Sequence, residues 1–205
     1  MSDVDEVYRK AAAEGAEGLY RDWATEYDAD NAAKGFELPY YMAGFVARHV
    51  PVDAGPILDA GAGTGWVGRT LAALGYPDIT AIDLSAEMLA VAAAMGCYND
   101  TRVMRLGGPL DFADNHFAAA TCVGSFGPGH APPESLFELA RVVRPGGHVI
   151  FNVVEAKWLD QGFPSVIDNL EGDGVWAAVE KPKPHRTYFI GEPELFTRPF
   201  IFKIN

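Results

Sequence analysis

The chain has 205 residues, a formal net charge of −12, and 49% hydrophobic against 21% charged residues. This length and composition suit one soluble globular domain, and the scattered basic residues of so acidic a chain argue against a nucleic-acid partner. The two cysteines, Cys97 and Cys122, lack the spacing of a metal site and are too few for a disulfide framework. The polar, acidic start and the lack of an apolar run of about 20 residues predict a cytoplasmic protein without a membrane contact.

Predicted helices and strands alternate after a helical amino-terminal region. Two short helices are expected between residues 3 and 28, and a third runs from Pro39 to about Val50. Apolar runs bounded by glycine and proline then predict strands at 57–58, 79–84, 102–106, 118–123 and 148–154. Between them, helices are expected at 64–74, 85–95 and 133–143. Ser85 would be the N-cap of the second of these helices. The alternation predicts an α/β, Rossmann-like, doubly wound sheet that is mainly parallel, with helices on both faces.

The last quarter of the chain has a different pattern. A helix near 164–171 precedes strand-like stretches at 175–180 and 200–204, and a stretch at 186–190 could extend the first of these. They predict a closing hairpin rather than another strand–helix unit.

The stretch ILDAGAGTGWVG, residues 57–68, has two interpretations. Read from Gly63 it has the dinucleotide pattern G-x-G-x-x-G, and read from Asp59 it has an acidic residue followed by G-x-G-x-G. Both readings place backbone N–H groups at the carboxyl end of a strand, where anionic ligand groups bind. The Asp59 charge would repel a diphosphate but favour the ammonium and sulfonium of S-adenosylmethionine. Alternatively, Asp59 is a structural carboxylate that fixes the loop by hydrogen bonds, and both roles can hold.

Asp83 ends the next predicted strand, in AIDLS. A carboxylate at this position can accept hydrogen bonds from both ribose hydroxyls of an adenosine ligand. A helix-capping or surface aspartate is the alternative. The chain has no Tyr-x-x-x-Lys pair, which disfavours a nicotinamide oxidoreductase.

Four segments within residues 57–154 together resemble the class I S-adenosylmethionine-dependent methyltransferases. ILDAGAGTGWVG and AIDLSAEML resemble the first and second motifs of that family, PLDFADNHFAAATCVGSF the entry to the fourth strand, and LARVVRPGGHVIFNV the helix, turn and strand that follow. LYRDWATEYD, residues 19–28, resembles the helix that covers the cofactor in many small-molecule members. More narrowly, LGGPLDF, CVGSFGPGHAP and the YRDWA-x-x-YD start resemble the methyltransferase-like group named after the Williams–Beuren deletion region.

The resemblance implies a single domain over residues 1–205, with a seven-stranded sheet whose last strand is antiparallel. Helices in 1–50 would cover S-adenosylmethionine, 56–154 would form the cofactor-binding core, and 155–205 would form the closing helix and hairpin. The implied cofactor-binding residues are Tyr20, Trp23, Tyr27, Asp59, Ala60, Gly61, Gly63, Thr64, Gly65, Asp83, Leu84, Met88, Leu106, Gly107, Val123, Gly124 and Ser125.

Most of these residues have an expected role. The alternating glycines would approach the methionine part of the cofactor, Asp83 would hold the ribose, and Leu84 and Met88 would pack near the adenine. Residues 123–125 would line the side of methyl transfer. The three aromatic residues would close over the cofactor, although their spacing also fits an ordinary buried helix face.

Two departures from the family pattern affect these expectations. Many members have an acidic residue after the third strand that bonds the adenine amino group, but here the segment reads RLGGPL, with Leu106 and Gly107. Backbone groups of this loop are expected to replace it, or the affinity is lower. Ala118 also replaces a common aspartate.

Methyl transfer from a sulfonium needs a general base only when the acceptor is protonated and weakly nucleophilic. His130, in the loop GSFGPGHAP, is the weak candidate for this role, ahead of His148 and Glu155. A histidine in such a loop can equally be structural or simply exposed. The [DN]-P-P-[YF] signature is replaced by GSFG, which argues against methylation of a nucleobase or amide nitrogen. Five aromatic residues could line an apolar acceptor pocket or pack in the core: Phe126, Phe151, Trp158, Phe163 and Trp176.

The sequence therefore predicts a monomeric or weakly dimeric S-adenosylmethionine-dependent methyltransferase with a small-molecule acceptor and no metal. The alternatives are a non-catalytic protein that binds the same cofactor or a partner, and a nucleotide-dependent oxidoreductase.

Overall fold

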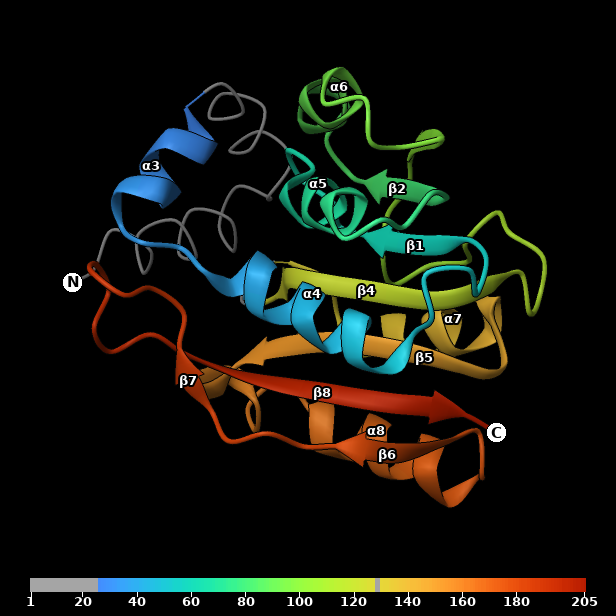
Figure 1. The fold of residues 1–205 in the computed structure, drawn as a ribbon. Helices are drawn as coiled ribbons and strands as arrows, with labels where there is room; N and C mark the ends of the chain where they lie inside the picture. Colours follow the sequence, from blue (N-terminus) through green and yellow to red (C-terminus); the bar gives the residue numbers. More distant parts are fainter. Residues whose placement is uncertain (1–25, 128–129) are drawn as a thin grey trace.

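The computed structural model describes residues 26–127 and 130–205. Figure 1 shows a twisted sheet with helices on either side. The strands are β1 (Ile57–Ala60), β2 (Ile79–Asp83), β3 (Asp100–Val103), β4 (Phe117–Phe126), β5 (Val143–Val154), β6 (Trp176–Glu180), β7 (His185–Arg186) and β8 (Phe196–Ile204). The helices are α3 (Tyr27–Ala33), α4 (Leu38–His49), α5 (Trp66–Ala73), α6 (Ala86–Ala94), α7 (Ser135–Val142), the 3-10 turn η1 (Glu155–Lys157) and α8 (Phe163–Gly172). None of the described helices has the length and apolar character needed to cross a bilayer.

The sheet has the strand order β3-β2-β1-β4-β5-β8-β6, and β7 pairs with β8 beside this path. Strands β1 to β5 are parallel to one another, whereas β8 is antiparallel to both β5 and β6. The predicted seven-stranded sheet with an antiparallel last strand is confirmed, and the two-residue β7 is an eighth, short strand. The order reverses between β1 and β4, which in open α/β sheets is where ligands bind.

The predicted closing hairpin is wrong in one respect. β6 and β8 do pair antiparallel, but β8 lies between β5 and β6. Because β8 is antiparallel to both, β6 runs in the direction of β5, and α8 with β6 forms another strand–helix–strand unit. The apolar side of α8 has to pack against a sheet face, and a helical crossover then returns the chain parallel. The stretch predicted at 186–190 contributes only Arg186 to β7.

The sheet separates two apolar layers. On one face, α4 buries Leu38, Met42 and Val46 against α5 and the strands, which is the helical spacing expected of a packed side. On the other face, α7 and α8 cover a larger cluster that includes Phe117 and Phe151. Figure 1 shows α4 and α5 in front of the sheet and α7 and α8 behind it. Because the helices cover the two faces of the sheet, the carboxyl ends of its parallel strands lie together along one edge.

Two strands differ from their predicted limits. β3 begins at Asp100, not Arg102, because its backbone pairs with β2 from Thr80 to Asp83, where β2 ends. β5 begins at Val143, so RPGG lies within the strand rather than before it. An irregularity in the pairing with β4 accommodates these extra residues.

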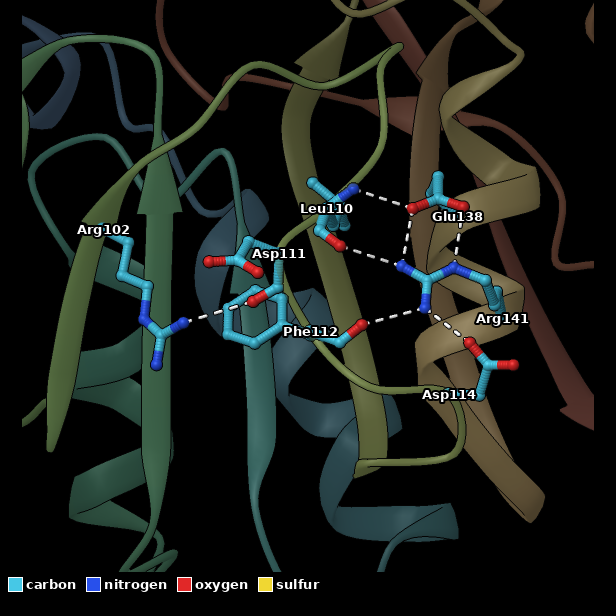
Figure 2. A network of polar contacts seen from close by, with 7 residues as sticks. All are labelled: Arg102, Leu110, Asp111, Phe112, Asp114, Glu138 and Arg141. Carbon is cyan, nitrogen blue, oxygen red and sulfur yellow. Dashed lines mark hydrogen bonds and ion pairs between the residues drawn. The ribbon is translucent and has the colours of Figure 1, made fainter.

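The segment between β3 and β4 has no helix and is held by a polar network centred on Arg141 of α7 (Figure 2). The Arg141 guanidinium donates to the carbonyls of Leu110 and Phe112, each at 2.9 Å, and pairs with Asp114 and Glu138. Glu138 in turn accepts the Leu110 N–H at 2.7 Å. This network fixes the backbone of a segment that begins next to the expected cofactor site.

Candidate functional site

The site predicted from the sequence lies where β1, β2 and β4 end. The loop after β1 is joined to β2 because the N–H groups of Gly61 and Ala62 both donate to the Ile82 carbonyl, at 2.8 and 3.0 Å. It is joined to β4 because the Ser125 hydroxyl donates to the Gly61 carbonyl at 3.2 Å. The three strand ends therefore form one continuous polar edge.

Asp83 connects the glycine loop to α6. One carboxylate oxygen accepts the Gly63 N–H at 2.8 Å, and the other accepts the Ser85 N–H at 2.9 Å. Ser85 is the predicted N-cap, since its hydroxyl accepts the Met88 N–H at 3.1 Å. Burial raises the pKa of Asp83, while these N–H donors and nearby His130 oppose the rise. The carboxylate is thus held in one orientation and is only partly covered.

The glycines of the loop differ in what surrounds them. Gly63 has a φ of +55°, and a side chain there would meet no atom of the described residues within 4 Å. Gly124, after the buried part of β4, has a φ of +74°, and a side chain there would likewise meet no described atom within 4 Å. A side chain at Gly61 would instead overlap Ser125. Gly61 therefore permits packing of β1 on β4, whereas Gly63 and Gly124 leave room for a ligand.

The packing around Gly68 explains why the sequence also fits the dinucleotide pattern. A Cβ at Gly68 would overlap the ring of Tyr98, which packs against the start of α5. The Tyr98 hydroxyl accepts the Gly68 N–H at 3.2 Å and donates to Asp59 at 2.6 Å. Thr121 also donates to Asp59, at 3.1 Å. The third glycine of the pattern serves the packing of an aromatic ring, with no diphosphate required.

Asp59 is the structural carboxylate that the sequence left open as an alternative. Its exposed fraction is 1%, and burial raises its pKa to about 6 even though Tyr98 and Thr121 stabilise the ionised form. Asp59 touches no open space itself, so any effect on a ligand acts through its charge and through the loop.

Helix α3 lies against the glycine loop. The Thr64 hydroxyl donates to Asp28 at 2.5 Å, so this predicted cofactor residue is engaged with α3. α3 is also tied to the carboxyl-terminal region, because the Tyr188 hydroxyl donates to Asn31 at 2.8 Å. Tyr27 is the first residue of α3, whereas Tyr20 and Trp23 lie outside the described residues.

The remaining predicted residues divide by exposure. Ala60, Thr64, Gly65 and Met88 are buried and form the support of the site. The partly or fully exposed members are Gly61, Gly63, Asp83, Leu84, Leu106, Gly107, Val123, Gly124 and Ser125. A side chain at Gly107 would overlap Pro132, so the loops after β3 and β4 are in contact. The predicted set is therefore brought together at one edge, with Leu106 beside Gly61.

The three predicted acid–base residues occupy different places. His130 follows β4, and its charge influences Asp83 across the site. His148 lies at the opposite end of the paired part of β5, stacked on His49 with ring centroids 5.7 Å apart. Glu155 is held by a two-point ion pair with Arg198. Glu155 also follows a strand end, that of β5, but its carboxylate is engaged with Arg198, so His130 is the better placed of the three for chemistry beside Asp83.

The predicted aromatic pocket is mostly core. Phe126, Phe151, Phe163 and Trp176 are at most 1% exposed and pack against one another in the cluster under α7 and α8. Trp158 is partly exposed and packs at the edge of that cluster, with Arg198 over its ring at 5.5 Å.

Sequence reasoning missed three residues that shape the site: Asp28, Tyr98 and Asn152. Asn152 is buried on β5; its side-chain oxygen accepts the Gly124 N–H at 2.9 Å, and its amide nitrogen donates to Thr197 at 2.6 Å. Asp28 belongs to the YRDWATEYD stretch, in which only the aromatic residues were expected at the cofactor. Tyr98 and Asn152 have no local signal, because their partners are distant in the sequence.

Comparison with known proteins gives the same family as the motifs. Residues 58–151 match a family described as a methyltransferase domain. Methyltransferase-like protein 27 of Homo sapiens is 31% identical over 167 residues, which are 77% of this chain and 66% of that protein. A malonyl-[acyl-carrier protein] O-methyltransferase of Erwinia billingiae is 31% identical over 134 residues, 62% of this chain and 46% of that protein. The chain spans about half to two thirds of the length of these relatives.

A solved complex of the Haloferax volcanii Trm112 methyltransferase activator with a methyltransferase has a similar fold. The TM-score is 0.68 at 16% identity, and the match covers 92% of this chain and 96% of that chain. An identity this low supports the fold and says nothing of substrate or partner.

Proposed function

The chain belongs to the class I S-adenosylmethionine-dependent methyltransferases, and we propose that it transfers a methyl group to a small-molecule acceptor by direct displacement. One observation carries this proposal. Gly63 follows β1 and Gly124 lies in the last part of β4, where the strand order reverses, and among the described residues both glycines have free space beside them, near the fixed carboxylate of Asp83. Such a polar, open edge suits a nucleoside cofactor and a second reactant.

The residues at this edge fit S-adenosylmethionine. Asp83 has lone pairs left for the ribose hydroxyls after accepting two N–H groups. No side chain of the described residues fills the space at Gly63 that the methionine part would need, and Leu84 and Leu106 offer partly exposed apolar surface for the adenine. When bound, the cofactor supplies a methyl group that its sulfonium has already activated. The protein then has to align the reactants and exclude water.

A small acceptor agrees with the charge of the chain and with its relatives. A net charge of −12 disfavours a polyanionic substrate such as RNA or DNA. The Erwinia relative is named for a malonyl group, a small acid carried on a protein. The acceptor would approach residues 123–125 and the following loop, where Asn152 and Ser125 hold the backbone in place.

We assign His130 as the general base for an acceptor that must lose a proton. Its loop is fixed to the end of β4, since the Ala131 N–H donates to the Ser125 carbonyl at 3.1 Å. Replacing His130 by Gln should lower kcat and remove an ionisation from the pH profile, with cofactor affinity unchanged. Unchanged kcat with an acidic hydroxyl acceptor would remove His130 from the reaction.

Two measurements test the function. Calorimetry with S-adenosylmethionine, S-adenosylhomocysteine and NAD should give binding of the first two, and NAD binding would overturn the proposal. A mixed pool of small metabolites should then stimulate formation of S-adenosylhomocysteine by the wild-type protein but not by Gly63→Val. Tight cofactor binding with no turnover in any pool would instead favour the non-catalytic alternative.

A further inference from the structure

A partly buried hydrogen-bond relay links the cofactor loop to the first turn of α5. Gly68 lies in that turn, where backbone N–H groups have no partner within the helix. Its N–H donates to the Tyr98 hydroxyl, which donates to Asp59 at the end of β1. Two residues after Asp59 the glycine loop begins. The relay therefore ends directly behind the loop that faces open space at Gly63.

Asp59 has a buried charge without a cation among the described residues. Its side-chain hydrogen-bond partners are two hydroxyls, and the charged or titratable groups around it are Asp83 on β2, Cys122 on β4, and Cys97 and Tyr98 before β3. Arg69 on α5 influences Cys97 and is exposed. A buried carboxylate normally has a positive partner, because isolated ionisation in a low-dielectric interior is costly. A cationic ligand at the adjacent loop would supply that partner.

We propose that Tyr98 is a positioning residue of the cofactor site: its hydroxyl keeps Asp59 ionised and fixed behind the glycine loop as the counter-charge for a cationic ligand. The inference rests on the proposed function, since the cation is the sulfonium or ammonium of the cofactor. Cofactor binding is then linked to protons. Ionised Asp59 favours the cation, and protonation as the pH falls through about 6 removes the attraction.

The relay predicts distinct pH profiles for the affinity of S-adenosylmethionine. In the wild-type protein the affinity should fall about tenfold between pH 7.5 and pH 5. In Tyr98→Phe the carboxylate loses a donor that stabilises its ionised form, so the fall should be centred about one pH unit higher. Asp59→Asn, which has no charge to lose, should bind at pH 7.5 about tenfold more weakly than the wild type and show a smaller fall.

Tyr76→Phe is a matched control. Its hydroxyl donates to the Val50 carbonyl at 2.6 Å and its side chain is buried, so this variant also loses a tyrosine hydrogen bond, away from the site. It should keep the wild-type pH profile even if its stability falls. Where Tyr98→Phe does not fold, Thr121→Val removes the other donor to Asp59 and should raise the midpoint in the same direction.

Calorimetry from pH 5 to 7.5 on these variants decides the inference. A midpoint that rises in Tyr98→Phe or Thr121→Val but not in Tyr76→Phe supports it. Wild-type affinity that does not change with pH, or a Tyr98→Phe profile identical to the wild type, overturns it and leaves the proposed function intact. No binding of S-adenosylmethionine at any pH would overturn both.

Discussion

The Asp83 carboxylate accepts the Gly63 N–H at 2.8 Å, and this hydrogen bond joins the carboxyl end of β2 to the glycine loop that follows β1. The second carboxylate oxygen accepts the Ser85 N–H, so the first turn of α6 is fixed by the same side chain. Two segments that are 20 residues apart in the sequence are thereby held at a fixed distance, with a partly exposed carboxylate between them.

Asp83→Ala should weaken binding of S-adenosylmethionine by about 1–3 kcal/mol, because hydrogen bonds to a charged acceptor are lost. Calorimetry measures the loss. Asp100→Ala, at the exposed edge strand β3, removes a carboxylate paired with Arg102 and should bind normally. Equal affinity of Asp83→Ala and the wild type would exclude this carboxylate from the site.

Gly63→Val should abolish cofactor binding, because the side chain would occupy the free space of the loop and the positive φ disfavours it. Gly146→Val is the matched control, since Gly146 also has a positive φ and free space among the described residues but lies in the irregular first part of β5, at the opposite end from the site. Both variants should lose about 1–2 kcal/mol of unfolding free energy. Normal cofactor affinity in a folded Gly63→Val protein would show that the loop is not the binding surface.

Gly68→Ala should lower the unfolding free energy by about 1–3 kcal/mol, because the new methyl group overlaps the Tyr98 ring. Thermal or urea unfolding measures the change. Combining it with Tyr98→Ala should give a smaller loss than the sum of the single changes, since removal of the ring relieves the overlap. Additive losses would mean that the two residues do not contact one another.

The fold could be predicted from the chain because its main signals are local. The alternation of apolar runs with capped helices predicted β1 to β5, and Ser85 caps α6 as expected. The placement of β8 between β5 and β6 could not be read locally, because strand order depends on how a distant strand pairs. The predicted site residues lie together at the ends of the strands, because the motifs that contain them occur where β1, β2 and β4 end.

The parts of the site that could not be predicted depend on contacts between distant segments. Tyr98 reaches Asp59 across 39 residues, and Asn152 reaches Gly124 from the next strand. Thr64 was expected at the cofactor, but its hydroxyl is paired with Asp28 of α3. A polar residue beside a glycine motif has the same sequence signal whether it touches a ligand or supports the loop.

Glu138→Gln should reduce the unfolding free energy at pH 7 by about 1–2 kcal/mol, because Arg141 then loses one of its two ionic partners in the network of Figure 2. The hydrogen bonds from Arg141 hold the pKa of Glu138 below its usual range. Glu138 therefore stabilises the fold above the pKa of the unfolded chain, and this contribution is lost as the pH falls through the lower folded pKa.

Urea titrations of this variant and the wild type should accordingly converge as the pH is lowered below about 4. Glu134→Gln, an exposed change at the start of the same helix, is the control and should match the wild type throughout. A stability difference that persists unchanged at low pH would contradict the role of the ion pair.

A crystal structure with S-adenosylhomocysteine is the most direct test of the cofactor site. The account predicts that both ribose hydroxyls lie within hydrogen-bond distance of the Asp83 carboxylate and that the amino-acid part crosses the loop at Gly63. Nucleoside density elsewhere on the protein, or a ligand that leaves Asp83 bonded to protein groups alone, would contradict it.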